Sequence, residues 1–130
     1  MFSEKLSPNV IPKRVVIIGS NGFVGSHVCD LFKLQKINTL ELSRNDVDLS
    51  SKNAVYKLKK VVPPGIDLII HCAAQQPRSG LLFKDYREGN VDTTENIVEW
   101  AKSANVQTMI SFSTIAFLDL PLEDGVEITE

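Results

Sequence analysis

Short apolar stretches alternate along this chain with longer segments whose apolar residues recur at helical spacing. The short stretches lie near residues 14–18, 37–42, 67–70 and 108–112, with a shorter one near 46–48. The first contains four consecutive β-branched residues, which is typical of a strand buried on both faces of a parallel sheet. Because strands alternate with helices and parallel crossovers are right-handed, the pattern predicts an α/β fold with a doubly wound parallel sheet.

The segments between these stretches predict three helices. One face of the first carries Phe23, Val24, Val28, Leu31 and Phe32. The second is expected to begin at a cap on Ser50 or Ser51 and to end at Pro63-Pro64-Gly65. The third spans about 83–103 with Gly89 as a weak point, and its inward residues are expected to be Val91, Thr94, Val98 and Ala101. Residues 75–82 are predicted to form a loop at the carboxyl ends of the strands, where ligands bind in such sheets.

Composition limits the function classes. A chain of 130 residues can bury one modest core, which corresponds to a single domain. The formal net charge of -2 and the scattered basic residues predict no nucleic-acid partner, and Lys57, Lys59 and Lys60 are interpreted as a solvated helix face. No run is long enough to span a membrane, and residues 1–13 lack the apolar core of a signal peptide. With Cys29 and Cys72 interpreted as free thiols, we expect a cytoplasmic protein without membrane contact.

Three glycines, Gly19, Gly22 and Gly25, directly follow the first strand and lead into the first helix. Gly19 can adopt a conformation closed to other residues, Gly22 permits close approach of the backbone to a pyrophosphate, and Gly25 permits tight packing of helix on strand. The helix N-terminus then presents free N–H groups and a partial positive charge to the phosphates. This strand-turn-helix context favours dinucleotide binding over an ordinary tight turn.

The sequence Gly-Ser-Asn-Gly-Phe-Val-Gly-Ser-His at residues 19–27 resembles the extended branch of the short-chain dehydrogenase/reductase superfamily, also called the NAD-dependent epimerase/dehydratase family. The resemblance covers nearly all of residues 14–130 and implies a Rossmann-type NAD(P)-binding domain, with residues 1–13 as an N-terminal extension. The cofactor-binding residues that follow from the turn and the resemblance are Gly19, Asn21, Gly22, Phe23, Val24, Gly25, Ser43, Arg44, Asp48, Leu49, Cys72, Ala73, Ala74, Gln75 and Asn90. The sequence has no metal-type ligand spacing, so no metal is expected.

The residue that follows the second strand is expected to meet the adenosine ribose of the cofactor. Counting 24 residues on from Gly19 reaches Ser43, where NAD-preferring relatives carry an acid, and Arg44 follows. A small hydroxyl beside an arginine suits a 2′-phosphate, so NADP is favoured over NAD. Glu41 is the alternative, since a shift of two residues would restore an acid at the ribose.

Two further matches to the family leave alternatives open. Asp46-Val47-Asp48-Leu49 matches the Asp-Leu or Asp-Val element that relatives place beside the adenine ring, and it is equally consistent with a turn and helix cap. Asn90 matches an asparagine that relatives hold near the active site, and it is equally consistent with a hydrogen-bonded core amide. His71 begins a His-Cys-Ala-Ala segment that closes over the cofactor in relatives, and it is interpreted as structural.

For catalysis, the resemblance implies that Thr114, or second Ser113, holds the substrate oxygen beside a tyrosine. The Val-Tyr-Gly of relatives is replaced by Phe117-Leu118-Asp119, and the catalytic Tyr-x-x-x-Lys expected further on is absent. Tyr56 and Lys60 have that spacing but precede the relevant strand, so they are interpreted as unrelated. The substrate-binding lobe is also absent, and we therefore expect a truncated domain rather than a natural remnant.

These inferences predict the NAD(P)-binding portion of an epimerase, dehydratase or reductase that acts on a nucleotide sugar by hydride transfer. The alternatives are a non-catalytic NAD(P)-binding or interaction module, and a reductase of a non-sugar ketone. The chain alone is expected to be inactive. Because residues 108–112 would form an open sheet edge, self-association into a homo-oligomer is also expected.

Overall fold

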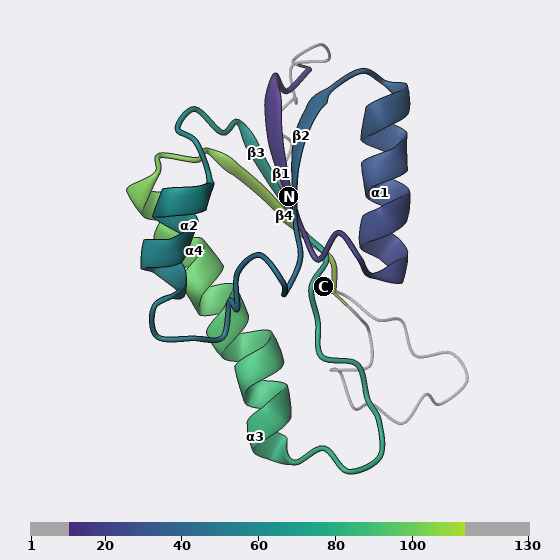
Figure 1. The fold of residues 1–130 in the computed structure, drawn as a ribbon, viewed down its shortest axis with the longest axis vertical. Helices are drawn as coiled ribbons and strands as arrows, with labels where there is room; N and C mark the ends of the chain where they lie inside the picture. The colour runs from purple at the N-terminus through teal and green to yellow at the C-terminus, as the bar shows by residue number, and fades with distance from the viewer. Residues whose placement is uncertain (1–10, 114–130) are drawn as a thin grey trace, which may run out of the picture.

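A computed structural model describes residues 11–113, in which four parallel strands form one sheet in the order β2-β1-β3-β4 (Figure 1). The strands are β1 (Arg14–Ile18), β2 (Asn38–Leu42), β3 (Leu68–His71) and β4 (Thr108–Ser111). In the central pair, Val15 lies opposite Leu68 and Ile18 lies opposite His71. The predicted α/β fold with a doubly wound parallel sheet is confirmed, and the strands at its centre all end at the same edge of the sheet.

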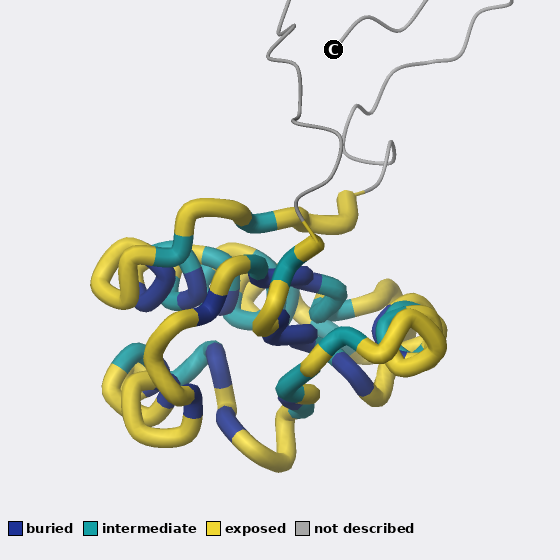
Figure 2. Tube along the Cα trace, turned by 90° about the horizontal axis from the view of Figure 1, so that it is seen from above, coloured by how far each residue is buried: buried dark blue, intermediate teal, exposed yellow. Residues whose placement is uncertain are grey.

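Helices cover both faces of this sheet (Figure 1). Helix α1 (Phe23–Leu34) lies on one face, and α2 (Ala54–Val61) and α4 (Thr93–Ser103) lie on the other. The larger core, between the sheet and α2 and α4, includes Val16, Ile18, Leu42, Leu58, Ile69, Ile97 and Trp100. The smaller core, under α1, comprises Val15, Ile17, Cys29 and Ile70. Both faces of β1 are therefore buried, as its β-branched run predicted (Figure 2).

The short strand expected near residues 46–48 does not form. Residues 44–46 make a turn instead, and Val47 and Asp48 follow it without regular structure. The Asp46 carboxylate accepts hydrogen bonds from the backbone N–H and the hydroxyl of Ser43, which closes the chain into the turn. Within the described residues β2 is consequently an edge strand.

The contact face of α1 also differs from the predicted one. Val28 and Phe32 pack against the smaller core, but Phe23 is 83% exposed and Leu31 is exposed as well. The buried residues of the helix are Gly25 and Cys29. Because Gly25 lets α1 approach the glycine turn closely, small side chains rather than large ones meet the sheet there.

The predicted caps of α2 are also wrong. Helix α2 begins after Asn53, and no side chain caps it. The Ser50 hydroxyl donates to the Asp48 carboxylate, so it is engaged before the helix begins. The Ser51 carbonyl accepts a hydrogen bond from the Asn96 side chain on α4 at 3.2 Å, which ties this loop to the neighbouring helix.

The third predicted helix is three consecutive segments: α3 (Phe83–Tyr86), the π-helical η1 (Arg87–Asp92) and α4. Gly89, the predicted weak point, lies inside η1. The buried residues of α4 are Thr93, Ile97, Trp100 and Ala101, whereas Val91 is exposed and Thr94 and Val98 are half-buried. Of the predicted inward residues, Ala101 is therefore buried and Thr94 contacts the buried His71, whereas Val91 is wrong because the π-helical turn breaks the phase between it and α4.

Candidate functional site

The glycine turn between β1 and α1 is built on close backbone contacts. Gly19 has a φ of +83°, and a Cβ at this position would lie 2.6 Å from the backbone nitrogen of Ala73. A Cβ at Gly25 would lie only 2.0 Å from the Gly19 carbonyl oxygen. At Gly22 the nearest contact of such a Cβ would be 3.3 Å, to the same oxygen. Gly19 and Gly25 are thus required by the protein's own packing, whereas the space in front of Gly22 is left free.

A cavity of about 500 Å³ opens beside this turn, at the carboxyl ends of the strands. Its size is within the range typical of small-molecule sites. Three segments form most of its wall, namely the glycine turn, the loop after β2 and the segment after β3. Residues from them that line the cavity are Gly19, Asn21, Gly22, Phe23, Val24, Ser43, Arg44, Asp48, Leu49, Cys72, Ala73 and Ala74.

The other predicted site residues lie elsewhere. Gly25 is buried against the Gly19 carbonyl, and Gln75 and Asn90 stand just outside the cavity wall, next to the lining residues Gln76 and Gly89. Ser113 follows β4 and is exposed, and Thr114 falls outside the described residues, as do residues 117–119. The structure therefore brings together the three segments predicted to hold the cofactor, and of the two candidate catalytic residues it describes only Ser113, which does not line the cavity.

The N-terminus of α1 faces the cavity. Its N-cap is Gly22, and its first residues, Phe23 and Val24, line the cavity wall. The first-turn backbone N–H groups of a helix have no partner within the helix, and they carry a partial positive charge. This end of the cavity is therefore suited to a phosphate group.

The loop after β2 is fixed by two carboxylates. Asp46 Oδ2 accepts from the Ser43 backbone N–H and hydroxyl, both at 2.7 Å, and these bonds hold the pKa of Asp46 below its ordinary value. Asp48 Oδ1 accepts from the Ser50 hydroxyl at 2.7 Å and from its backbone N–H at 3.1 Å, and the pKa of Asp48 is lowered mainly by the first. Asp48 thus makes the turn interaction that its sequence context allowed while also lining the cavity.

Glu41 is not part of this wall. It lies on β2, and its carboxylate makes an ion pair with Lys33 of α1 at 2.8 Å. That position faces α1, whereas the next residue, Leu42, belongs to the opposite core and lines the cavity. Glu41, the alternative predicted for the ribose, therefore does not line the cavity in this structure.

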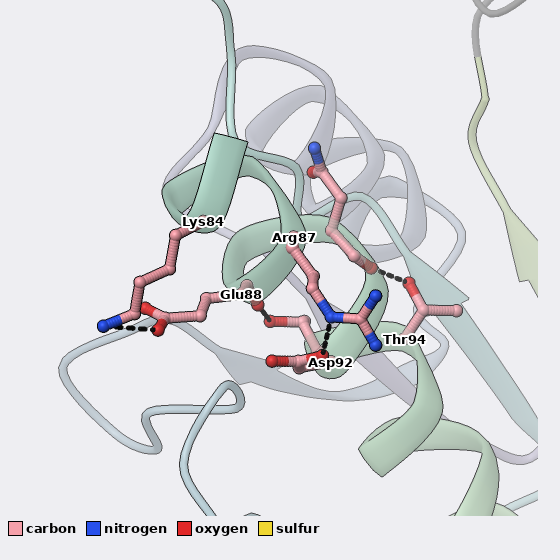
Figure 3. Close-up of polar contacts among 7 residues, drawn as sticks. Lys84, Arg87, Glu88, Asp92 and Thr94 are labelled. Atoms are coloured by element: carbon pink, nitrogen blue, oxygen red, sulfur yellow. Dashed lines mark hydrogen bonds and ion pairs between the residues drawn. The ribbon is translucent and has the colours of Figure 1, made fainter. Parts of the chain in front are cut away.

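The π-helical segment η1 reaches the cavity at Gly89, and the polar contacts around this segment are drawn in Figure 3. Two interactions join residues five apart in and beside η1: Arg87 pairs with Asp92 at 3.7 Å, and the hydroxyl of Thr93, the first residue of α4, donates to the Glu88 carbonyl at 3.0 Å. Such a spacing does not bring side chains together on an α-helix, where neighbours are three or four residues apart. These contacts therefore fit the wider π-helical turn.

This wider turn brings Gly89 against the loop that follows β3. A Cβ at Gly89 would lie 2.5 Å from the Cβ of Gln75. The next residue, Asn90, accepts a hydrogen bond from the Gln75 backbone N–H through its side-chain oxygen at 2.7 Å. Asn90 is therefore a half-buried, hydrogen-bonded amide that holds the Gln75 backbone at the rim of the cavity.

His71 lies behind the cavity and is 3% exposed. The Thr94 hydroxyl donates to the Asn90 carbonyl at 2.7 Å, so its oxygen accepts from His71 Nε2 at 3.1 Å. Nδ1 is then an acceptor, and it has no partner within the described residues. Burial holds the pKa of His71 below its ordinary value, which favours the neutral ring, and the burial and the Thr94 contact are consistent with the structural role predicted from the sequence.

Both cysteines are free thiols. Cys29 is buried in the smaller core, and Cys72 is half-buried in the cavity wall. Burial raises the pKa of each thiol, so both are protonated at neutral pH. Among residues 11–113, no three or more His, Cys, Asp or Glu side chains gather in an arrangement that could hold a metal ion.

Residues 15–127 match the family model described as NAD dependent epimerase/dehydratase family. The match covers the glycine turn, the loop after β2 and the segment after β3. The chain belongs to this family. A comparison with curated proteins gives no match.

Solved structures with the same fold include members of this family and related reductases. UDP-galactose 4-epimerase is 22% identical with a TM-score of 0.64, over 78% of this chain and 38% of that protein. MoeE5 in complex with UDP-glucuronic acid and NAD is 25% identical with a TM-score of 0.65, over 78% and 36%. dTDP-4-dehydrorhamnose reductase from Bacillus anthracis in complex with NADP is 18% identical with a TM-score of 0.63, over 77% and 36%. The chain thus spans little more than a third of the length of these proteins.

The cavity of this family member contains residues that the sequence patterns did not identify. Asn45, Val47 and Ser50 line it from the loop after β2, and Gly89 and Thr93 line it from the π-helical side. Asn45 and Val47 stand between the predicted site residues Arg44 and Asp48, and Ser50 directly follows Leu49, so a prediction of the whole loop would have included them. Gly89 carried one signal, a glycine inside a helical pattern, which often marks a close contact.

In the described part of the chain, the helices are too short and too polar to cross a membrane.

Proposed function

We propose that this chain is the cofactor-binding part of an enzyme that transfers hydride between NAD(P) and a nucleotide sugar. The observation that carries the proposal is the cavity at the carboxyl ends of the strands, where the N-terminus of α1, the loop after β2 and residues 72–74 converge. The family is described as NAD dependent, and two of the neighbours above were solved with a cofactor, one with NAD and UDP-glucuronic acid and one with NADP. The bound nicotinamide would supply or accept the hydride.

The residues present fit such a cofactor. The open space in front of Gly22 and the N–H groups at the start of α1 suit a pyrophosphate. The loop after β2 would hold the adenosine, with Asp48 and Leu49 beside the adenine. The small residues Ala73 and Ala74 would leave room for the nicotinamide side of the molecule.

We further propose that NADP is preferred over NAD. No acid occupies position 43, and Glu41 is paired with Lys33 on the other face of β2. Arg44 lines the cavity, and within residues 11–113 its guanidinium makes no ion pair. An arginine with free donors beside the ribose is the group that recognises a 2′-phosphate best.

Arg44→Ala tests this preference. Removal of a charged hydrogen-bond donor to a phosphate is expected to weaken NADPH binding by about 10- to 100-fold, because such a bond contributes roughly 1.5–3 kcal/mol. NADH binding should change little. Calorimetric titration of both cofactors gives the two dissociation constants, and Lys59→Ala, a loss of charge on α2 outside the cavity wall, is the matched control. An equal loss for NADH and NADPH would show that Arg44 does not contact the 2′-phosphate.

For the catalytic step, we propose that Ser113 or Thr114 holds the substrate oxygen and that the chain alone does not turn over a nucleotide sugar. The one Tyr-x-x-x-Lys in the sequence is Tyr56 to Lys60. These residues lie on α2, outside the cavity wall, where Lys60 Nζ stands 4.7 Å from the centre of the Tyr56 ring. They make a surface cation–π contact, so they cannot supply the acid and base.

A second candidate is a module that binds NAD(P) without catalysis, and the position of Tyr56 and Lys60 outside the cavity wall is consistent with it. A turnover assay with UDP-glucose and NADP separates the alternatives for this chain, since cofactor binding without turnover is expected. Turnover would show that this chain does contain a catalytic acid, contrary to the proposal. A Tyr-x-x-x-Lys encoded downstream in the same gene would favour the enzyme.

A further inference from the structure

The turn after β2 has an internal network that uses every polar group of Ser43. The Ser43 N–H and hydroxyl both donate to Asp46 Oδ2 at 2.7 Å. The hydroxyl oxygen accepts from the Asn45 N–H at 3.3 Å, and the Ser43 carbonyl accepts from the N–H of Asp46 at 3.1 Å and of Val47 at 3.3 Å. Ser43 therefore has no proton left to donate to a ligand.

The two sides of this turn have different environments. Ser43, Arg44, Asn45 and Val47 line the cavity, whereas Asp46 is exposed and is not part of the cavity wall. The carboxylate therefore closes the turn from the side away from the cavity. Within the described residues, the Arg44 backbone N–H makes no hydrogen bond and its guanidinium makes no ion pair, so its donors remain available.

We infer that Asp46 is a positioning residue for cofactor selectivity, which holds the Ser43–Asp46 turn so that Arg44 faces the 2′-phosphate of NADP. This inference rests on the proposed function. It assigns the direct recognition of the phosphate to Arg44 alone and gives Ser43 an internal role. An acid in this position then favours a phosphate ligand, although its charge by itself would repel one.

The opposing effect of the charge is the smaller one. The Asp46 carboxylate is open to solvent, where water and salt screen its interaction with an anion on the other side of the turn. Water and salt do not weaken the positional effect of the turn in the same way. The turn must hold Arg44 in place for its forked donors to meet the phosphate oxygens. The two effects predict opposite results for a neutral replacement of Asp46.

Asp46→Asn is the decisive variant, because it keeps the shape and an oxygen that can accept both hydrogen bonds from Ser43 but removes the charge that strengthens them. We expect the dissociation constant for NADPH to rise about tenfold, comparable to the loss of one charged hydrogen bond, while that for NADH changes less than about twofold. Ser43→Ala, which removes only the hydroxyl, should give a smaller rise, and Ser43→Thr should restore the wild-type ratio. Asp30→Asn, on the exposed surface of α1, is the control for the change in net charge.

Calorimetric titrations at low salt and at about 1 M salt separate geometry from charge, because the screening length falls to roughly 3 Å at the higher value. A loss of NADPH selectivity that persists at high salt supports the inference. Tighter NADPH binding by Asp46→Asn, or an unchanged ratio of NADPH to NADH affinity in both Asp46→Asn and Ser43→Ala, would overturn it. If the wild-type chain binds neither cofactor, the proposed function fails as well, so the two failures are distinguishable.

Discussion

Substitution of two glycines by alanine should separate cofactor binding from folding. A Cβ at Gly25 would lie 2.0 Å from the Gly19 carbonyl oxygen, whereas real Cβ contacts essentially never fall under 3.0 Å. Helix α1 would have to move away from the turn by about 1 Å, the difference between 3.0 Å and 2.0 Å, and it would lose its contact with the turn. Overpacking of this kind costs about 3 kcal/mol, which outweighs the roughly 1 kcal/mol that alanine gains over glycine in a helix. We therefore expect Gly25→Ala to lower the free energy of unfolding by about 2 kcal/mol or more.

Gly22→Ala is the matched variant at the mouth of the cavity. Gly22 has φ of -75° and ψ of 171°, which alanine adopts without strain, and the new methyl group would contact only the Gly19 carbonyl oxygen at 3.3 Å. The loss of a preferred N-cap residue and the lower entropy of the unfolded chain nearly cancel, so stability should change by less than about 1 kcal/mol. The methyl group would, however, fill the space proposed for the pyrophosphate. NADPH affinity should fall about 100-fold, the equivalent of roughly 2.7 kcal/mol.

The assays are urea unfolding followed by circular dichroism and calorimetric titration with NADPH, applied to both variants. Gly22→Ala with wild-type affinity for NADPH would show that the pyrophosphate does not approach this backbone. Gly25→Ala with wild-type unfolding would contradict the close contact between α1 and the turn.

Two further substitutions test the supports of the site. Burial holds the pKa of His71 low, so as the pH falls below about 6.5 the unfolded chain takes up a proton that the folded chain does not. The free energy of unfolding should therefore drop by up to roughly 1.4 kcal/mol per pH unit below that pH. Urea unfolding between about pH 7 and 5 should show this slope in the wild type and in His27→Gln but not in His71→Gln, and an equal slope in all three would refute it. Asn96 Nδ2 donates to the Leu49 and Ser51 carbonyls at 2.9 and 3.2 Å, so Asn96→Ala should cost about 1–3 kcal/mol by leaving them unpaired. The control is Asn53→Ala, at a helix start without a side-chain cap, which should change the free energy of unfolding by under about 0.5 kcal/mol. Equal losses in the two variants would show that the Asn96 hydrogen bonds do not stabilise this loop.

The sequence was sufficient to predict the fold because its strongest signals are local. The β-branched run of β1 and the glycine spacing that follows it both act within a few residues, and they specify a buried strand, a turn and a helix start. The contact face of α1 could not be predicted in the same way. It depends on how closely Gly25 approaches Gly19, a distance that hydrophobic periodicity does not record.

For the candidate site, the sequence predicted the three segments of the wall but not the interactions that shape them. The pattern at residues 46–49 favours an adenine-side element and a turn equally. It does not specify that the Asp46 carboxylate binds Ser43, although an acid three residues after a serine is a recognisable turn signal. The cavity positions of Gly89 and Thr93 depend on the π-helical register of η1. The ion pair between Arg87 and Asp92 reflects this register, because residues five apart are not neighbours on an α-helix.

The π-helical turn also has a consequence for how this family member can vary in length. A π-helical turn holds about one residue more than an α-helical turn, so removal of one residue within η1 would leave an uninterrupted α-helix. The residues before and after the deletion would keep their orientation, and α4 would still bury Ile97 and Trp100. What would be lost is the bulge that brings Gly89 against Gln75. Among close homologues, a one-residue gap at this point would therefore mark proteins that kept the core but gave up this wall of the cavity.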